Sequence, residues 1–192
     1  MNMNRAIPTV AMMCLLLSAC LQGRAQPNAN RSVLPSATAT YPPLAVETLK
    51  NATYHSTSLP GNFQLVNGLY QLPPLPGESQ DDYFIRLVDP IAFGDLNNDG
   101  WPDAAVILKS RAGGAGVFSD LAAVLNQNGK PLNIATVDLG DRVLVNSAVI
   151  QDGEIVLDMM IHGPNEGLCC ASLRATWKFK LSGSNLVQLP GP

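Results

Sequence analysis

Short apolar segments separated by two-residue turn signals fill most of the chain after residue 60, and this pattern limits the fold more than any other feature. Asx-Gly pairs favour tight hairpins because Asn, Asp and Gly tolerate the positive φ angles that such turns require. The turn signals are Asn67-Gly68, Asn128-Gly129, Gly140-Asp141 and Asp152-Gly153. Their spacing predicts about seven or eight antiparallel strands. The longer predicted strands are residues 104–108, 117–125, 132–139, 143–150, 155–161 and 173–181.

These segments predict a mainly β domain, either an antiparallel β-sandwich or a strongly curved barrel-like sheet. Segment 173–181 alternates most clearly, with Trp177 and Phe179 on an apolar face and lysines on a face exposed to water. A first tight hairpin is expected around Asn67-Gly68. One short helix is expected between residues 44 and 54. Parallel βαβ architecture is excluded because crossover helices are missing.

The N-terminus predicts export. Arg5 precedes an apolar stretch from Ala6 to Ala19, which is the anatomy of a signal peptide and is too short to span a bilayer as a helix. The tetrad Leu17, Ser18, Ala19 and Cys20 resembles the lipobox of bacterial lipoproteins, in which the cysteine is lipidated and the chain is cut before it. The alternative is ordinary cleavage after Ala25, which would release a soluble protein.

The expected organisation is a signal peptide over residues 1–19, a lipid-anchored flexible linker over 20–43, and one β-rich domain over 44–192. The linker is rich in Asn, Ala, Ser, Thr and Pro and lacks apolar periodicity. Lipidated Cys20 would attach the protein to a membrane of the cell envelope. Leu21 follows it, where an aspartate would resemble an inner-membrane retention signal, so the outer membrane is expected in a two-membrane cell.

The charge balance argues against nucleic-acid binding. The chain has 12 basic and 15 acidic residues, and only Arg5 leaves with the signal, so the mature charge is 11 minus 15, or −4. A phosphate-binding surface needs clustered Lys and Arg, which this chain lacks.

Residues 94–103, Gly-Asp-Leu-Asn-Asn-Asp-Gly-Trp-Pro-Asp, predict a calcium loop. With Asp95 as position 1, oxygen-bearing side chains stand at positions 1, 3, 5 and 9, and a glycine at position 6 permits a sharp bend. Ca²⁺ takes about six to eight oxygen ligands. The expected set is Asp95, Asn97, Asp99, the carbonyl of Trp101 and Asp103, completed by water, and the ion is expected to be structural. The alternative is a solvated Asx-rich turn without metal.

The loop resembles the calcium loops of FG-GAP repeats, whose ligand roles fall on the same five residues. Position 12 is Val106, so an EF-hand is a poor match. The chain has a single copy, whereas a propeller needs at least about four blades, so the propeller fold is not implied. The order of features also resembles uncharacterised bacterial envelope lipoproteins with a single FG-GAP-like calcium loop, which implies a shared fold and no activity.

Cys169 and Cys170 are expected to be structural loop cysteines, with a disulfide between them as one option. A soft-metal or redox site with His162 is the alternative. His55 and His162 lack metal-ligand spacing, and no nucleophile motif is visible. The expected function is therefore a non-enzymatic binding or accessory module for an unidentified envelope protein or glycan. The rivals are a calcium-requiring envelope hydrolase and a metal or redox sensor built on the two cysteines.

Overall fold

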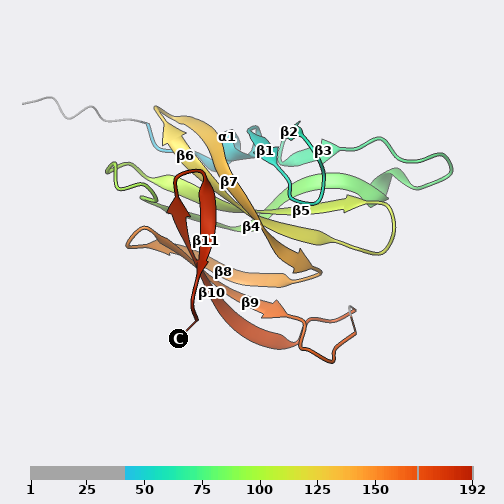
Figure 1. Ribbon diagram of the computed structural model, residues 1–192. Coiled ribbons are helices and arrows are strands. Elements are labelled where there is room, and N and C mark those ends of the chain that lie inside the picture. The colour runs from blue at the N-terminus through green and yellow to red at the C-terminus, as the bar shows by residue number, and fades with distance from the viewer. Residues whose placement is uncertain (1–41, 168, 192) are drawn as a thin grey trace, which may run out of the picture. The chain divides into compact units, whose positions relative to one another are not determined.

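A computed structural model describes residues 42–167 and 169–191, so the predicted signal peptide, Cys20 and most of the predicted linker lie outside the described residues. Within them the chain is mainly β, with one short α-helix and eleven strands in antiparallel sheets (Figure 1). The elements are α1 (Val46–Lys50), β1 (Thr53–His55), β2 (Asn62–Gln64), β3 (Leu69–Gln71), the 3-10 turn η1 (Gln80–Asp82), β4 (Tyr83–Gly94), β5 (Asp103–Ala112), β6 (Phe118–Gln127), β7 (Lys130–Asp141), β8 (Leu144–Gln151), β9 (Glu154–Ile161), β10 (Leu173–Ser182) and β11 (Asn185–Leu189).

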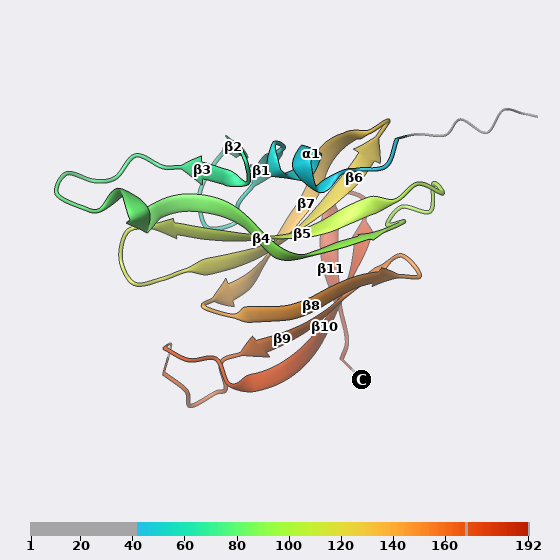
Figure 2. The ribbon, with the colours of Figure 1, turned by 180° about the vertical axis from the view of Figure 1, so that it is seen from behind.

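The strands form a five-stranded sheet ordered β3-β4-β5-β6-β7, a four-stranded sheet ordered β11-β10-β9-β8, and a β1-β2 ribbon. The two larger sheets share one core, to which Ile107 and Leu121 contribute from one side and Leu157 and Phe179 from the other. Neither sheet closes on itself, and Figure 2 shows β8, β9 and β10 on one side of the five-stranded sheet. The prediction of a mainly β, antiparallel fold is confirmed.

The five-stranded sheet is buried on both faces. Its second face packs against α1 and the β1-β2 ribbon in a separate core that includes Leu49, Tyr54, Leu65 and Val106. Two-sided burial explains why residues 104–108 of β5 form a continuous apolar run, because both faces of that strand avoid water.

The expected N-terminal helix is present as α1, and the apolar residues Leu44, Leu49 and Ala52, in and beside it, are all buried. Thr48 holds the first turn, because its Oγ1 donates to the carbonyl of Ala45 at 2.7 Å. The Tyr54 hydroxyl donates to the Leu49 carbonyl at 2.8 Å, which joins the helix to β1.

At two of the predicted hairpins the structure differs from the prediction. Asn67 and Gly68 have φ angles of 53° and 83° and make a tight turn, but only Val66 and Leu69 pair across it. Beyond that bridge β2 pairs with β1, and β3 pairs with β4. The strands part because Phe63 of β2 stands opposite Tyr54 of β1, and both side chains are buried in the second core.

Gly140-Asp141, the second of these, is not a hairpin turn, because β7 and β8 belong to different sheets. Asp141 Oδ1 accepts from the Val117 N–H at 2.8 Å, and the Arg142 N–H donates to the Val117 carbonyl at 2.7 Å. These bonds hold the chain beside the start of β6, and from there it crosses to the four-stranded sheet.

The predicted orientation of strand 173–181, with Trp177 and Phe179 toward the core, is confirmed. Phe179 is buried and Trp177 packs beside it in the shared core, whereas Leu173 is exposed at the start of the strand. Residues 83–90 of β4 and all of β11 are strands that the sequence pattern did not predict.

Candidate functional site

The predicted calcium loop connects the end of β4 at Gly94 to the start of β5 at Asp103. Asp95 organises it, because Asp95 Oδ2 accepts from the Gly100 N–H at 2.8 Å and Oδ1 accepts from the N–H groups of Asn97 and Asp99 at 3.2 and 3.3 Å. Gly100 has a φ of 86°, which favours glycine, and supplies the bend that brings its N–H to Asp95.

The side chains at alternate positions fold the loop further. Asn97 Oδ1 accepts from the Asp99 N–H at 3.0 Å, and Asp99 Oδ1 accepts from the Trp101 N–H at 2.8 Å. Asn97 Nδ2 donates to Asp99 Oδ2 at 2.8 Å. The structure therefore brings the side chains of Asp95, Asn97 and Asp99 together around the backbone of one tight loop.

Asp103 lies at the base of the loop and is 0% exposed. Its Oδ2 accepts from the Leu96 N–H at 3.0 Å inside the loop, and its Oδ1 accepts from the Asn126 N–H of β6 at 2.8 Å. Burial raises the pKa of the Asp103 carboxyl, the two backbone hydrogen bonds oppose that rise, and the charges of Asp99 and Asp95 add to it. Asp103 thus joins the loop to the five-stranded sheet.

The donor chemistry of the loop suits a hard cation. Asp95, Asp99 and Asp103 are three carboxylates within nine residues, and in the described part of the chain none forms an ion pair with Lys, Arg or His. Across residues 42–167 and 169–191, no three side chains of His, Cys, Asp and Glu converge closely enough to hold a metal ion. Two of the five expected ligands, the Asn97 amide and the Trp101 carbonyl, are neutral oxygens, so calcium would not need three carboxylates to converge.

The two predicted loop cysteines are both free and exposed. The pKa of the Cys170 thiol is raised, chiefly by its hydrogen bond with Cys169 and by the negative charge that Cys169 carries when ionised. These thiols follow strand β9 in the loop that leads to β10.

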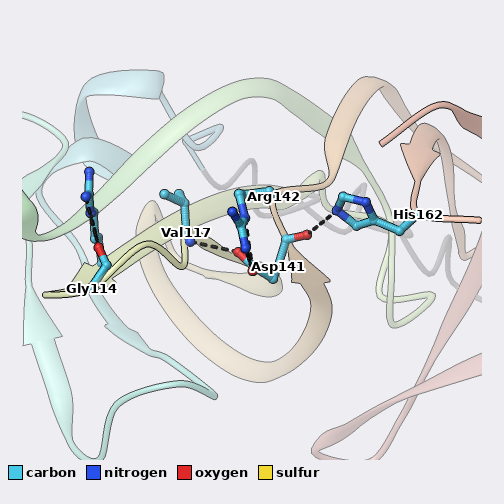
Figure 3. A network of polar contacts seen from close by, with 6 residues as sticks. Gly114, Val117, Asp141, Arg142 and His162 are labelled. Atoms are coloured by element: carbon cyan, nitrogen blue, oxygen red, sulfur yellow. Dashed lines mark hydrogen bonds and ion pairs between the residues drawn. The ribbon is translucent and has the colours of Figure 1, made fainter. Parts of the chain in front are cut away.

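His162 belongs to a separate polar network with Asp141 and Arg142 (Figure 3). His162 Nε2 lies 3.1 Å from the Asp141 carbonyl oxygen, and the Arg142 guanidinium donates to Asp141 Oδ2 at 2.6 and 3.0 Å. The ion pair holds the pKa of Asp141 below its ordinary value. This network stabilises the segment that connects the two sheets, and His162 contributes its Nε2 atom to it.

A hollow lies elsewhere in the described domain, between β1 and β7, and the sequence pattern did not indicate it. It has a volume of about 450 Å³ and is lined by side chains that include His55, Asn62, Leu132 and Asn133. The alternation of polar and apolar residues in Thr53–His55 and Asn62–Gln64 is the only sequence signal, and it marks an exposed ribbon face without indicating its neighbour on β7.

No protein-family model, curated protein or solved structure matches this chain. Among the described residues, no helix has the length and apolarity needed to cross a membrane. The function is therefore inferred from the residues of the site themselves.

Proposed function

We propose that this chain is a lipid-anchored envelope protein whose antiparallel β-sandwich is stabilised by calcium and serves, without catalysis, as a binding or accessory module. The loop between β4 and β5 is the observation that carries the proposal. Its oxygen-bearing side chains fold it through Asx-type hydrogen bonds, and its last carboxylate is buried in the sheet.

The proposed ligands are Asp95, Asn97, Asp99, the Trp101 carbonyl and Asp103. Carboxylate, amide and peptide oxygens are the ligands that Ca²⁺ prefers, and the ion's charge would offset the repulsion among three neighbouring carboxylates. Because Asp103 accepts from both Leu96 and Asn126, ion binding would stabilise the junction between the loop and β6. The proposed role of calcium is therefore structural.

The envelope location rests on the lipobox-like residues that end in Cys20, which lie outside the described residues. The negative mature charge disfavours nucleic acid as a partner. The non-enzymatic role rests on the sequence, which holds no recognisable nucleophile motif. A glycan or another envelope protein remains the proposed class of partner.

A calcium titration of the full-length chain tests the loop. Calcium in about hundredfold excess over Kd would stabilise the folded state by about 2.7 kcal/mol, which corresponds to a melting temperature higher by roughly 5 to 10 °C. Asp99→Ala removes one proposed ligand and should abolish this shift. Asp81→Ala is the matched control, because Asp81 is an exposed aspartate of η1 outside the loop, and it should keep the shift.

Calorimetry on the wild-type chain tests whether the loop binds calcium at all. If millimolar calcium produces no heat and no change in melting temperature, the loop is an Asx-rich turn and the calcium proposal fails. The same conclusion follows if Asp99→Ala responds to calcium as the wild type does.

A further inference from the structure

A second hollow lies beside the one between β1 and β7. The second hollow has a volume of about 410 Å³ and shares His55 with the first, and its lining includes Thr57, Thr136 and Ser184. We call the two together the β1–β7 groove. Each volume lies within the range of about 300 to 1,000 Å³ that is usual for ligand sites.

One wall of the groove is the outer face of the β1-β2 ribbon. Thr53 stands opposite Gln64 and His55 opposite Asn62, so these four side chains share one face. The other face carries Tyr54 and Phe63, which are buried in the second core. The buried face therefore fixes the ribbon in place while four polar, exposed side chains line the groove.

The opposite wall is held by Asn133 of β7. Its Nδ2 donates to the carbonyls of Ala123 and Ala135, where the β6-β7 register shifts, at 3.1 and 3.0 Å. Its Oδ1 accepts from the His55 N–H at 2.8 Å and from the Thr136 hydroxyl at 3.2 Å. Every polar atom of this side chain is engaged, so the groove is preformed and the two walls are joined at its middle.

Polar side chains on the ribbon wall of the groove remain available for a ligand. Within residues 42–167 and 169–191, the amide of Asn62 and the imidazole of His55 make no hydrogen bond, and both residues are exposed. An amide both donates and accepts, as does a neutral imidazole. Pro131 and Leu132, which is 37% exposed, supply an apolar patch in the same hollow.

Neither hollow is lined by Asp, Glu, Lys or Arg. A charged ligand would lose hydration without gaining a counter-charge, which disfavours it. A neutral saccharide has hydroxyls that donate and accept, and C–H faces that pack against apolar surface. An extended peptide fits less well, because the bond between His55 and Asn133 interrupts the edge of β7 that a new strand would follow.

We propose that the β1–β7 groove binds a neutral oligosaccharide through Asn62, His55 and the patch of Pro131 and Leu132. This inference rests on the proposed function as a binding module and names its ligand class.

Titration of the full-length chain with maltotetraose, cellotetraose and chitotetraose, followed by calorimetry and amide chemical shifts, tests the groove. At least one saccharide should bind and shift amides within residues 51–64 and 131–136. Asn62→Ala and His55→Ala should each weaken binding by about 3- to 10-fold, since each removes a hydrogen bond to the ligand. Asn165→Ala alters an exposed asparagine outside the groove and should leave affinity unchanged.

Binding to none of the three saccharides overturns the proposal, as does binding that neither groove variant weakens or that shifts amides elsewhere. Binding of a neutral Ser-Gly dodecapeptide in place of the saccharides would also overturn it, in favour of strand addition. Melting temperatures of all variants, which alter exposed residues, establish that each is folded. Calcium-dependent melting is recorded on the same samples. If the wild type shows no calcium response but binds a saccharide, only the calcium proposal fails. If it responds to calcium but binds no saccharide, only the groove proposal fails.

Discussion

Buried or engaged polar side chains join elements of this domain that share no backbone ladder. Asn133 ties β7 to β1, Asp103 ties the β4-β5 loop to β6, and Asp120 ties β6 to the segment after β1. Asp120 is 1% exposed and accepts from the Ser56 hydroxyl at 2.9 Å, the Thr57 N–H at 3.1 Å and the Thr57 hydroxyl. Asp103 and Asp120 satisfy donors that would otherwise be buried without a partner, so removing either carboxylate should cost more than one ordinary hydrogen bond.

Asp120 gives a prediction with a defined pH dependence. Burial raises its pKa, against the lowering effect of the hydrogen bonds from Thr57 and Ser56. The folded state therefore holds this proton more tightly than the unfolded chain, whose carboxyl has a pKa of about 3.9. The stabilising contribution of this titration is complete below that pH and is lost as pH rises through the folded-state pKa.

Asp120→Asn removes the titration. The free energy of unfolding of the wild type minus that of the variant should fall as pH rises above about 4 and then level off. Urea denaturation of both proteins across that range measures it. A difference that stays constant with pH would show that the Asp120 carboxyl titrates alike in the folded and unfolded chains.

Strand β10 gives a prediction at the scale of an element, because exposure varies along it. Phe179 is buried in the shared core, Trp177 is partly buried with its ring 6.3 Å from that of Phe179, and Leu173 is exposed. Phe179→Ala should lower the free energy of unfolding by about 3 to 5 kcal/mol, Trp177→Ala by less, and Leu173→Ala by least. Chemical denaturation gives the ranking, and a larger loss at Leu173 than at Phe179 would mean that the start of this face, and not its end, is the buried part.

Local signals predicted the elements better than their partners. The Asn-Gly and Asp-Gly turns at 67, 128 and 152 have positive φ at both positions, as their chemistry requires. The crossing after β7 was missed because Gly140-Asp141 has the same composition as a turn, whereas its direction depends on Val117, which is distant in sequence. The apolar run at 104–108 predicted a strand, whereas its burial on both faces depends on α1 and the β1-β2 ribbon, which cover the second face of the sheet.

The same contrast between local and long-range signals applies to the candidate sites. The proposed calcium loop is contiguous in sequence, so residue spacing could place its expected ligands. The β1–β7 groove depends on a bond between His55 and Asn133, which are 78 residues apart, and on a register shift that a single sequence does not reveal. Long-range contacts of this kind follow from packing of the two cores and have no local sequence signature.

At the scale of the whole molecule, the loop and the groove meet at one hairpin. Asn126 of β6 donates its N–H to Asp103 at the base of the loop, and it stands opposite Pro131, which lines the groove. The Asn126 side chain also donates to the Pro42 carbonyl at 3.0 Å, where the described chain begins. The β6-β7 hairpin thus connects the proposed ion loop, the proposed ligand site and the segment that leads toward the proposed lipid anchor.

The last prediction concerns that anchor. If Cys20 is lipidated, the wild-type chain should sediment with membranes and require detergent for release, because two acyl chains give stable attachment where one gives only marginal binding. Cys20→Ser should move the protein to the soluble fraction, while Cys14→Ser, which alters a cysteine within the predicted signal peptide, should leave it on membranes. Mass spectrometry of the mature N-terminus separates the two processing routes: a lipidated Cys20 supports the anchor, whereas an unmodified chain that begins at Gln26 would establish cleavage after Ala25 and a released protein.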